Sequence, residues 1–258
     1  MHDVLAIFSG SMVGFILGLI GGGGSILAVP LLVYVVGVPS PHIAIGTGAV
    51  AVAVNALMSL VGHARAGNVR WPCAIVFSVV GMIGAAFGSM LGKSFDGQRL
   101  LTLFGLLMIA IAASMAMKRE ASGGKFEPLI ADNAARLVPR LASYGLATGA
   151  LSGFFGIGGG FLIVPGLIAA ADMPLLGAVG SSLVSVSAFG LTTAASYAMS
   201  GLIDWKLVAL FVIGGFAGSL LGASAAGALA QSKQALSKVF AGIVGITGAY
   251  VVLRWMMA

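Results

Sequence analysis

Charged residues are scarce in this chain. Asp, Glu, Lys and Arg make up 8% of its 258 residues, against about 25% in soluble domains. Hydrophobic residues make up 59%, and the mean hydropathy is +1.11. This composition excludes a water-soluble globular protein and predicts a multi-span integral membrane protein surrounded by the lipid bilayer.

Several further absences narrow the class of protein. The single cysteine, Cys73, forms no intramolecular disulfide and no Cys-x-x-Cys pair, which argues against a thiol-relay oxidoreductase. The apolar runs are continuous rather than alternating, so we expect an all-α fold and not a β-barrel. The net charge of +6 lies almost wholly in loops, where it sets membrane topology and contacts anionic headgroups rather than nucleic acid.

The predicted spans contain no Asp, Glu, Lys or Arg deep inside them. Proton-coupled transporters usually place ionisable residues there, so a carboxylate proton relay is disfavoured. No Gly-Lys-Ser/Thr sequence completes a nucleotide phosphate loop. We expect no cofactor and no metal.

What the chain does contain is a repeat. Six positions recur 135 residues later with the same residue type: Gly14, Gly18, Gly21, Gly23, Gly24 and Pro30 become Gly149, Gly153, Gly156, Gly158, Gly159 and Pro165. A second block, Gly67–Trp71, matches Gly201–Trp205 at an offset of 134. We therefore predict two homologous membrane repeats, 1–117 and 141–258, joined by a polar cytoplasmic linker over 118–140.

Each repeat is predicted to begin with a glycine-broken helical hairpin, followed by three transmembrane helices. Residues 4–37 are too long for one crossing of about 20 residues and too short for two comfortable ones. A re-entrant hairpin and two strongly tilted short spans both fit. Either choice leaves an odd number of spans in each half, which predicts that the second repeat is inverted. Loop charges divide nine against four in the inverted and the parallel arrangement alike, so this prediction depends on length alone.

Glycine clusters at matching points of two apolar halves point to a transporter's binding site. Glycine lets a ligand reach peptide N–H groups, and helix starts after the two breaks would bind an anion without a basic side chain. Hydroxyls at matching places and one amide within a span supply further donors. Close helix packing and interhelical hydrogen bonds are the simpler interpretation of these residues. The predicted substrate-binding residues are Gly22, Gly23, Gly24, Ser25, Thr47, Asn55, Gly158, Gly159, Gly160, Ser181 and Ser182.

The ordered pattern resembles the TauE/SafE-type sulfite exporters, also called the TSUP family. The resemblance covers nearly the whole chain and is carried by Gly18-x-x-Gly21-x-Gly23-Gly24 with Pro30, His63–Trp71, Gly153-x-x-Gly156-x-Gly158-Gly159-Gly160 with Pro165, Gly180-Ser181-Ser182 and Gly201–Trp205. It implies a multi-pass transporter of the cytoplasmic (inner) membrane that moves sulfite, a sulfonate such as sulfoacetate, or a related sulfur oxyanion, usually outward. Arg70 departs from its counterpart Asp204, which puts the functional equivalence of the two ends in doubt.

Together these observations favour an exporter of a small sulfur-containing anion that works by alternating access. A transporter of a different small organic anion is an alternative function. Assembly of the protein into a homo-oligomer is a separate possibility that the sequence leaves open. An intramembrane serine hydrolase would need a serine beside a histidine, but His42 and His63 lie at predicted helix ends and no Gly-x-Ser-x-Gly is present. A non-transporting assembly subunit is disfavoured by the duplicated break.

Overall fold

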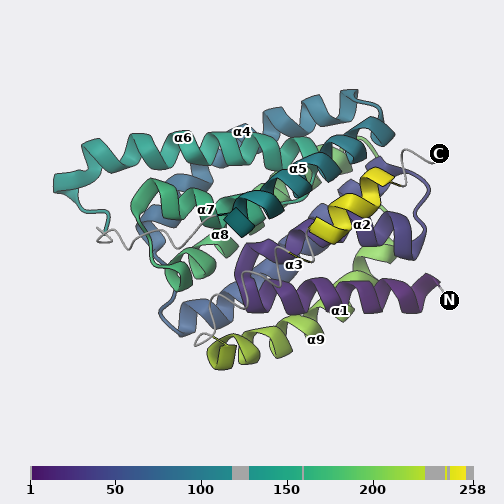
Figure 1. Cartoon of the computed structure of the whole chain (residues 1–258), viewed down its shortest axis with the longest axis horizontal. Helices are drawn as coiled ribbons and strands as arrows, with labels where there is room; N and C mark the ends of the chain where they lie inside the picture. Colours follow the sequence, from purple (N-terminus) through teal and green to yellow (C-terminus); the bar gives the residue numbers. More distant parts are fainter. Residues whose placement is uncertain (1, 118–127, 159, 230–241, 243–244, 254–258) are drawn as a thin grey trace.

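The computed structural model describes residues 2–117, 128–158, 160–229, 242 and 245–253 as a bundle of helices (Figure 1). No strand occurs among these residues, which confirms the all-α prediction for the described part of the chain. Residues 245–253 form a last helix. The other elements are, in order, α1 (His2–Ile20), the 3₁₀ helix η1 (Gly21–Leu27), α2 (Ala28–Pro30), the π-helical turn η2 (Leu31–Val36), α3 (Pro41–Arg65), α4 (Trp71–Ser94), α5 (Gly97–Met117), α6 (Ala131–Phe155), α7 (Gly160–Ala171), α8 (Leu175–Ala198) and α9 (Trp205–Leu229).

Among the described residues, five segments are long and apolar enough to cross a membrane, which agrees with a multi-pass protein. They are His2–Val36, Pro41–Arg65, Trp71–Ser94, Leu175–Ala198 and Trp205–Gly222. Shorter apolar helices cover Gly97–Ala113 and Gly160–Ala171. Helix α6 begins at Ala131, so part of the polar segment 118–140 is helical.

Local chemistry explains where the long helices begin and end. Helix α3 starts with Pro41 after Ser40, whose hydroxyl accepts a hydrogen bond from the N–H of Ile43. Proline is favoured in the first turn because its missing N–H and fixed φ suit that place. The chain leaves α3 and α8 through Gly67 and Gly201, with φ of +70° and +68°, a conformation that glycine adopts at little cost.

The first 36 residues fold back on themselves at the glycine cluster. Gly21 has φ +72°, and a 3₁₀ turn replaces the α-helix from this residue to Leu27. Gly24 packs on α1 so closely that a Cβ there would lie 2.5 Å from the N atom of Leu17. At the other end, the imidazole Nδ1 of His2 lies 2.8 Å from the carbonyl oxygen of Val36. Residues 2–36 therefore form a hairpin whose two ends meet and whose glycine turn is the tip.

Helices α6 and α7 form the corresponding hairpin of the second half. Helix α6 ends at Phe155 and is followed by Gly156, which has φ +66°; the N–H of Ile157 bonds to the carbonyl oxygen of Ser152 at 3.2 Å. Gly158 also has a positive φ, +64°. Two left-handed residues this close together reverse the chain, and α7 then returns along α6, with Gly166 against Thr148.

The two halves exchange their outer helices. Helix α1 of the first half packs on α9 of the second, and α6 of the second half packs on α4 of the first. In each pair glycines lie directly on the partner's backbone, so that any side chain would collide with a carbonyl group. Gly10 and Gly14 contact Phe211 and Gly215, while their counterparts Gly145 and Gly149 contact Phe77 and Gly81.

Helices α3 and α8 occupy matching places in the two halves, pack against each other and are largely buried. Gly46 near the start of α3 contacts Tyr197 near the end of α8, and Gly190 contacts Ala49 and Ala53. Residues near the start of α3 therefore contact residues near the end of α8, so the two helices run antiparallel.

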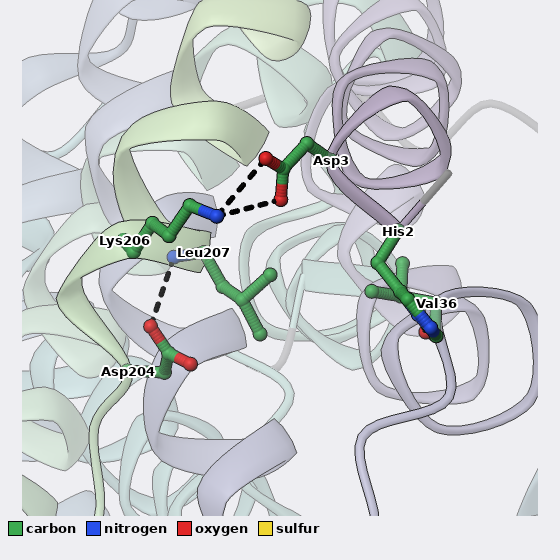
Figure 2. Close-up of polar contacts among 6 residues, drawn as sticks. All are labelled: His2, Asp3, Val36, Asp204, Lys206 and Leu207. Atoms are coloured by element: carbon green, nitrogen blue, oxygen red, sulfur yellow. Dashed lines mark hydrogen bonds and ion pairs between the residues drawn. The ribbon is translucent and has the colours of Figure 1, made fainter.

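The start of α1 and the end of the helix 245–253 lie toward the same end of the bundle, which we call the terminal end (Figure 1). Polar contacts near the start of α9 are gathered there (Figure 2): the Lys206 ammonium lies 2.9 Å from Asp3, and the carboxylate of Asp204 accepts the N–H of Leu207 at 3.1 Å. The opposite end holds the last turn of α3, with His63, and the loop that leads to α4.

Candidate functional site

The two hairpin tips touch. The backbones of Gly22 and Gly160 are in direct contact, and a Cβ on Gly22 would lie 2.5 Å from the Cα of Gly160. Both residues are buried. Since neither position has room for a side chain, the peptide groups themselves form the contact between the two halves.

Serine hydroxyls surround this contact. The N–H of Gly22 donates to the hydroxyl of Ser182 on α8, at 3.2 Å, and the N–H of Gly160 donates to the hydroxyl of Ser25, also at 3.2 Å. Each hydroxyl donates in turn to a backbone carbonyl: Ser25 to Gly22 at 2.9 Å, and Ser182 to Val179 at 2.7 Å. We call Gly22, Ser25, Gly160 and Ser182 the tip cluster.

The two halves contribute differently to the tip cluster. Ser25 and Gly160 occupy equivalent positions at the offset of 135, so one hydroxyl serves both halves. Its oxygen joins the two tips by hydrogen bonds to Gly22 and Gly160.

No charged side chain is buried within the described residues. The tip cluster therefore offers only neutral dipoles: peptide N–H groups and hydroxyls that donate or accept according to their rotation. Such donors bind an oxyanion without the cost of burying an opposite charge first.

Three other predicted glycines, Gly23, Gly24 and Gly158, lie around the tip cluster. Gly23 and Gly24 are buried in the first tip, and Gly24 packs on α1. Gly158 faces Val52 and Val186, where a Cβ would lie 3.2 and 3.5 Å from their methyl groups. Gly159 lies outside the described residues.

The hydroxyls of Thr47 and Ser181 bond outside the tip cluster, to loops at opposite ends of the bundle. The hydroxyl of Thr47 accepts the N–H of Asp204 at 3.0 Å, and the hydroxyl of Ser181 accepts the N–H of Arg70 at 2.8 Å. At the offset of 134 these two bonds are equivalent, with the halves exchanged. Each hydroxyl thus holds the loop that precedes a helix of the other half; a role in substrate binding stays a prediction.

Asn55 is fully buried in the middle of α3, and neither atom of its amide has a hydrogen-bond partner in the described structure. It lies against Gly215 of α9, where any side chain would collide with the amide. Its role as a substrate ligand also stays a prediction.

The sequence alone does not indicate the bonds of Ser25 and Ser182 with the opposite half. Ser25 follows Gly24 and Ser182 lies two residues after Gly180, and only the match between the two halves suggests that the tips face each other. A hydrolase site is not assembled among the described residues. The hydroxyl of Ser152 has no partner there, and His42 and His63 bond to the carbonyl oxygens of Phe95 and Gly18.

Comparison with known proteins decides the family, because the sequence profile described as "Sulfite exporter TauE/SafE" matches residues 6–251. The chain belongs to the TauE/SafE sulfite exporter family. This TauE/SafE protein is therefore a multi-pass membrane transporter and not an enzyme.

Its curated relatives are described as probable membrane transporter proteins. A "Probable membrane transporter protein" of Xylella fastidiosa is 50% identical over 251 residues, which cover 97% of this chain and 95% of the relative. A probable membrane transporter protein of Methanocaldococcus jannaschii is 33% identical over 203 residues, which cover 75% of this chain and 70% of the relative. "Probable membrane transporter protein YunE" of Bacillus subtilis is 29% identical over 87% of this chain and 88% of its own. No solved structure matches the chain.

Proposed function

We propose that this TauE/SafE protein exports a small sulfur-containing anion, sulfite or an organosulfonate such as sulfoacetate, across the cytoplasmic membrane, and that the tip cluster binds it. One observation carries the proposal: peptide N–H groups from both hairpin tips meet in a buried region without charge, and each bonds to a hydroxyl oxygen. A sulfite or sulfonate oxygen is an acceptor of the same kind as that hydroxyl oxygen.

When the anion binds, the existing donors of the tip cluster change their hydrogen-bond acceptors, and no new donor is needed. The anion's oxygens accept the N–H groups of Gly22 and Gly160, while Ser25 and Ser182 turn their hydroxyl hydrogens from carbonyl oxygens to the anion. Hydrogen bonds to a charged acceptor are about twice as strong as neutral ones, so the exchange favours the bound anion. Export also gains about 2.3 kcal/mol per charge for each 100 mV of a negative-inside potential.

We further propose that the two repeats are inverted and rock against each other to alternate access. The antiparallel course of α3 and α8 supports this, because equivalent helices of parallel repeats would run the same way. The course of the last helix supports it too: Gly105 of α5 lies near Val251, and Ala112 lies near Gly245, so residues 245–253 run against α5. With the 118–140 segment in the cytoplasm, this helix points to the outer face.

The test is anion binding and efflux by Ser25→Ala and Ser182→Ala, with Ser187→Ala as the matched control. Ser187 is buried on α8, like Ser182, but its hydroxyl bonds only to Leu183 of its own helix. Losing one hydrogen bond to a charged ligand costs about 1.5–3 kcal/mol, so each site variant should bind sulfite about 10- to 150-fold more weakly. Unchanged or tighter binding by both site variants would refute the assignment of the site.

The substrate itself is tested by a thermal-shift screen of the purified protein with sulfite, sulfoacetate, thiosulfate and acetate. Stabilisation by the sulfur anions and not by acetate is expected. Stabilisation by carboxylates alone would favour the alternative, a transporter of a different small organic anion that uses the same tip cluster.

A further inference from the structure

A row of buried polar side chains runs along one face of α3. Asn55, Ser59 and His63 follow each other at intervals of four residues, which places them on the same face one turn apart. Their exposed fractions are 0%, 3% and 5%. Each has at least one side-chain atom without a hydrogen-bond partner in the described protein: both amide atoms of Asn55, the hydroxyl of Ser59 and Nδ1 of His63.

His63 shows what the row offers to a ligand. Its Nε2 lies 3.4 Å from the carbonyl oxygen of Gly18, just before the first hairpin tip. Because a carbonyl oxygen only accepts, Nε2 carries the hydrogen in this contact, and Nδ1 faces its surroundings as an acceptor. The row therefore runs from Asn55 in the middle of α3 to the base of the tip and presents both donors and acceptors.

Helix α8 carries a second row at the equivalent positions. Thr193 and Tyr197 match Ser59 and His63 at the offset of 134, both are fully buried, and neither hydroxyl has a partner in the described part of the chain. His42 continues this row: its ring centre lies 6.3 Å from that of Tyr197, and its buried Nδ1 also lacks a partner.

The second row ends beside a positive charge. The ammonium of Lys93 lies 5.8 Å from the centre of the Tyr197 ring and bonds to the carbonyl oxygen of Ser196 and the hydroxyl of Ser200, at 2.9 and 3.0 Å. A fixed ammonium at this place attracts an anion to the end of the row.

We propose that the two rows line water-filled paths that lead to the hairpin tips from opposite ends of the bundle, and that the transported anion moves along them. Buried polar atoms without protein partners are usually satisfied by ordered water. Because α3 and α8 run antiparallel, the row on α3 leads to the opposite end and the row on α8 to the terminal end. Hydroxyl, amide and imidazole groups suit a small hydrated anion, which needs donors but would be trapped by a buried full charge. The anion part of this proposal depends on the proposed function; the water does not.

Cysteine accessibility tests the paths. In a Cys73→Ala background, Ser59→Cys and Thr193→Cys are treated in sealed vesicles of either orientation with a membrane-impermeant anionic methanethiosulfonate. Ala53→Cys is the control, because Ala53 is fully buried on α3 but faces Gly190 of α8. We expect Ser59→Cys to lose its free thiol from one side, Thr193→Cys from the other, and Ala53→Cys from neither. Protection of both row positions, or equal labelling of Ala53→Cys, would overturn the proposal, and labelling of both rows from one side would overturn the opposite-end arrangement.

A second measurement, hydroxyl-radical oxidation of side chains, uses the unmodified protein and requires no variant. Radiolysis of water produces hydroxyl radicals that oxidise side chains next to internal water. His63 and Tyr197 should be oxidised, while Phe77, a fully buried aromatic residue, should not. His63 and Tyr197 as unreactive as Phe77 would contradict the water paths even if the tip variants lose sulfite binding. Oxidation of both rows in a protein whose tip variants bind normally would instead leave the paths standing and remove the proposed site.

Discussion

The exchanged bonds of Thr47 and Ser181 allow a quantitative test of how the two halves are held together. Thr47→Val and Ser181→Ala keep nearly the same volume but remove the hydroxyl that accepts the N–H of Asp204 or Arg70. Both hydroxyls are fully buried, and each loop N–H is left without its acceptor. An unmade bond of this kind costs about 1–3 kcal/mol, and partial exposure of the loops favours the lower value, about 1 kcal/mol each.

We expect each substitution to lower the Tm of the purified protein by about 2–4 °C, the shift that 1 kcal/mol produces in a chain of roughly this size. The two sites lie at opposite ends of the bundle and share no partner, so the double variant should lose the sum. Thr192→Val is the control, since that hydroxyl bonds only to Ala188 of its own helix. The reasoning is refuted if the single variants are as stable as the control, or if the double variant loses no more than one of them.

The same variants test the predicted ligand role of Thr47 and Ser181. A purely structural role leaves the sulfite affinity of the folded variants unchanged. Weaker sulfite binding that persists after correction for the fraction of unfolded protein would support the prediction that these hydroxyls contact the substrate.

Three further predictions concern single substitutions. Gly62→Ala should raise the free energy of unfolding by about 0.5–1 kcal/mol, because nothing lies within 4 Å of the Cβ position and alanine is the better helix former. Gly84→Ala should instead abolish the packing of α4 on the carbonyl group of Leu146 and reduce the yield of folded protein. Lys206→Ala should leave the Tm almost unchanged, because the side chains of Lys206 and Asp3 are 70% and 52% exposed and solvent screens their attraction. A marked, salt-sensitive loss of Tm would show instead that this ion pair holds α1 on α9.

Much of the fold is predictable from the sequence because it follows from local chemistry. Continuous apolar runs require helices in lipid, and glycine clusters interrupt them at Gly21 and Gly156, where the structure has left-handed residues. The partners of the helices are not predictable in this way. Nothing in the residues of α1 tells that Gly14 will lie on Gly215 of the other half, since the glycine spacing marks a packing face without naming its partner.

The candidate site shows the same division. The repeat indicates that the two glycine clusters are equivalent, and the structure brings Gly22 and Gly160 together. Periodicity gives the face on which a side chain lies but not its partner in another helix. Ser181 is the sequence neighbour of Ser182, and Thr47 is the counterpart of Ser181 at the offset of 134, yet their hydroxyls bond to loops at opposite ends. The sequence also places His63 only at a helix end, whereas the folded chain buries it beside Gly18.

The exchange of outer helices has a consequence for biosynthesis. Helix α1 leaves the ribosome first, but the backbone on which its glycines pack belongs to α9, about two hundred residues later in the chain. During translation the glycine face of α1 therefore contacts lipid or a membrane chaperone until α9 has been synthesised. Helix α4 likewise lacks its partner α6 at first, but over a much shorter stretch of chain. Final assembly thus depends on completion of the second half, and a chain truncated before Trp205 would leave the glycines of α1 that pack on α9 without their partner.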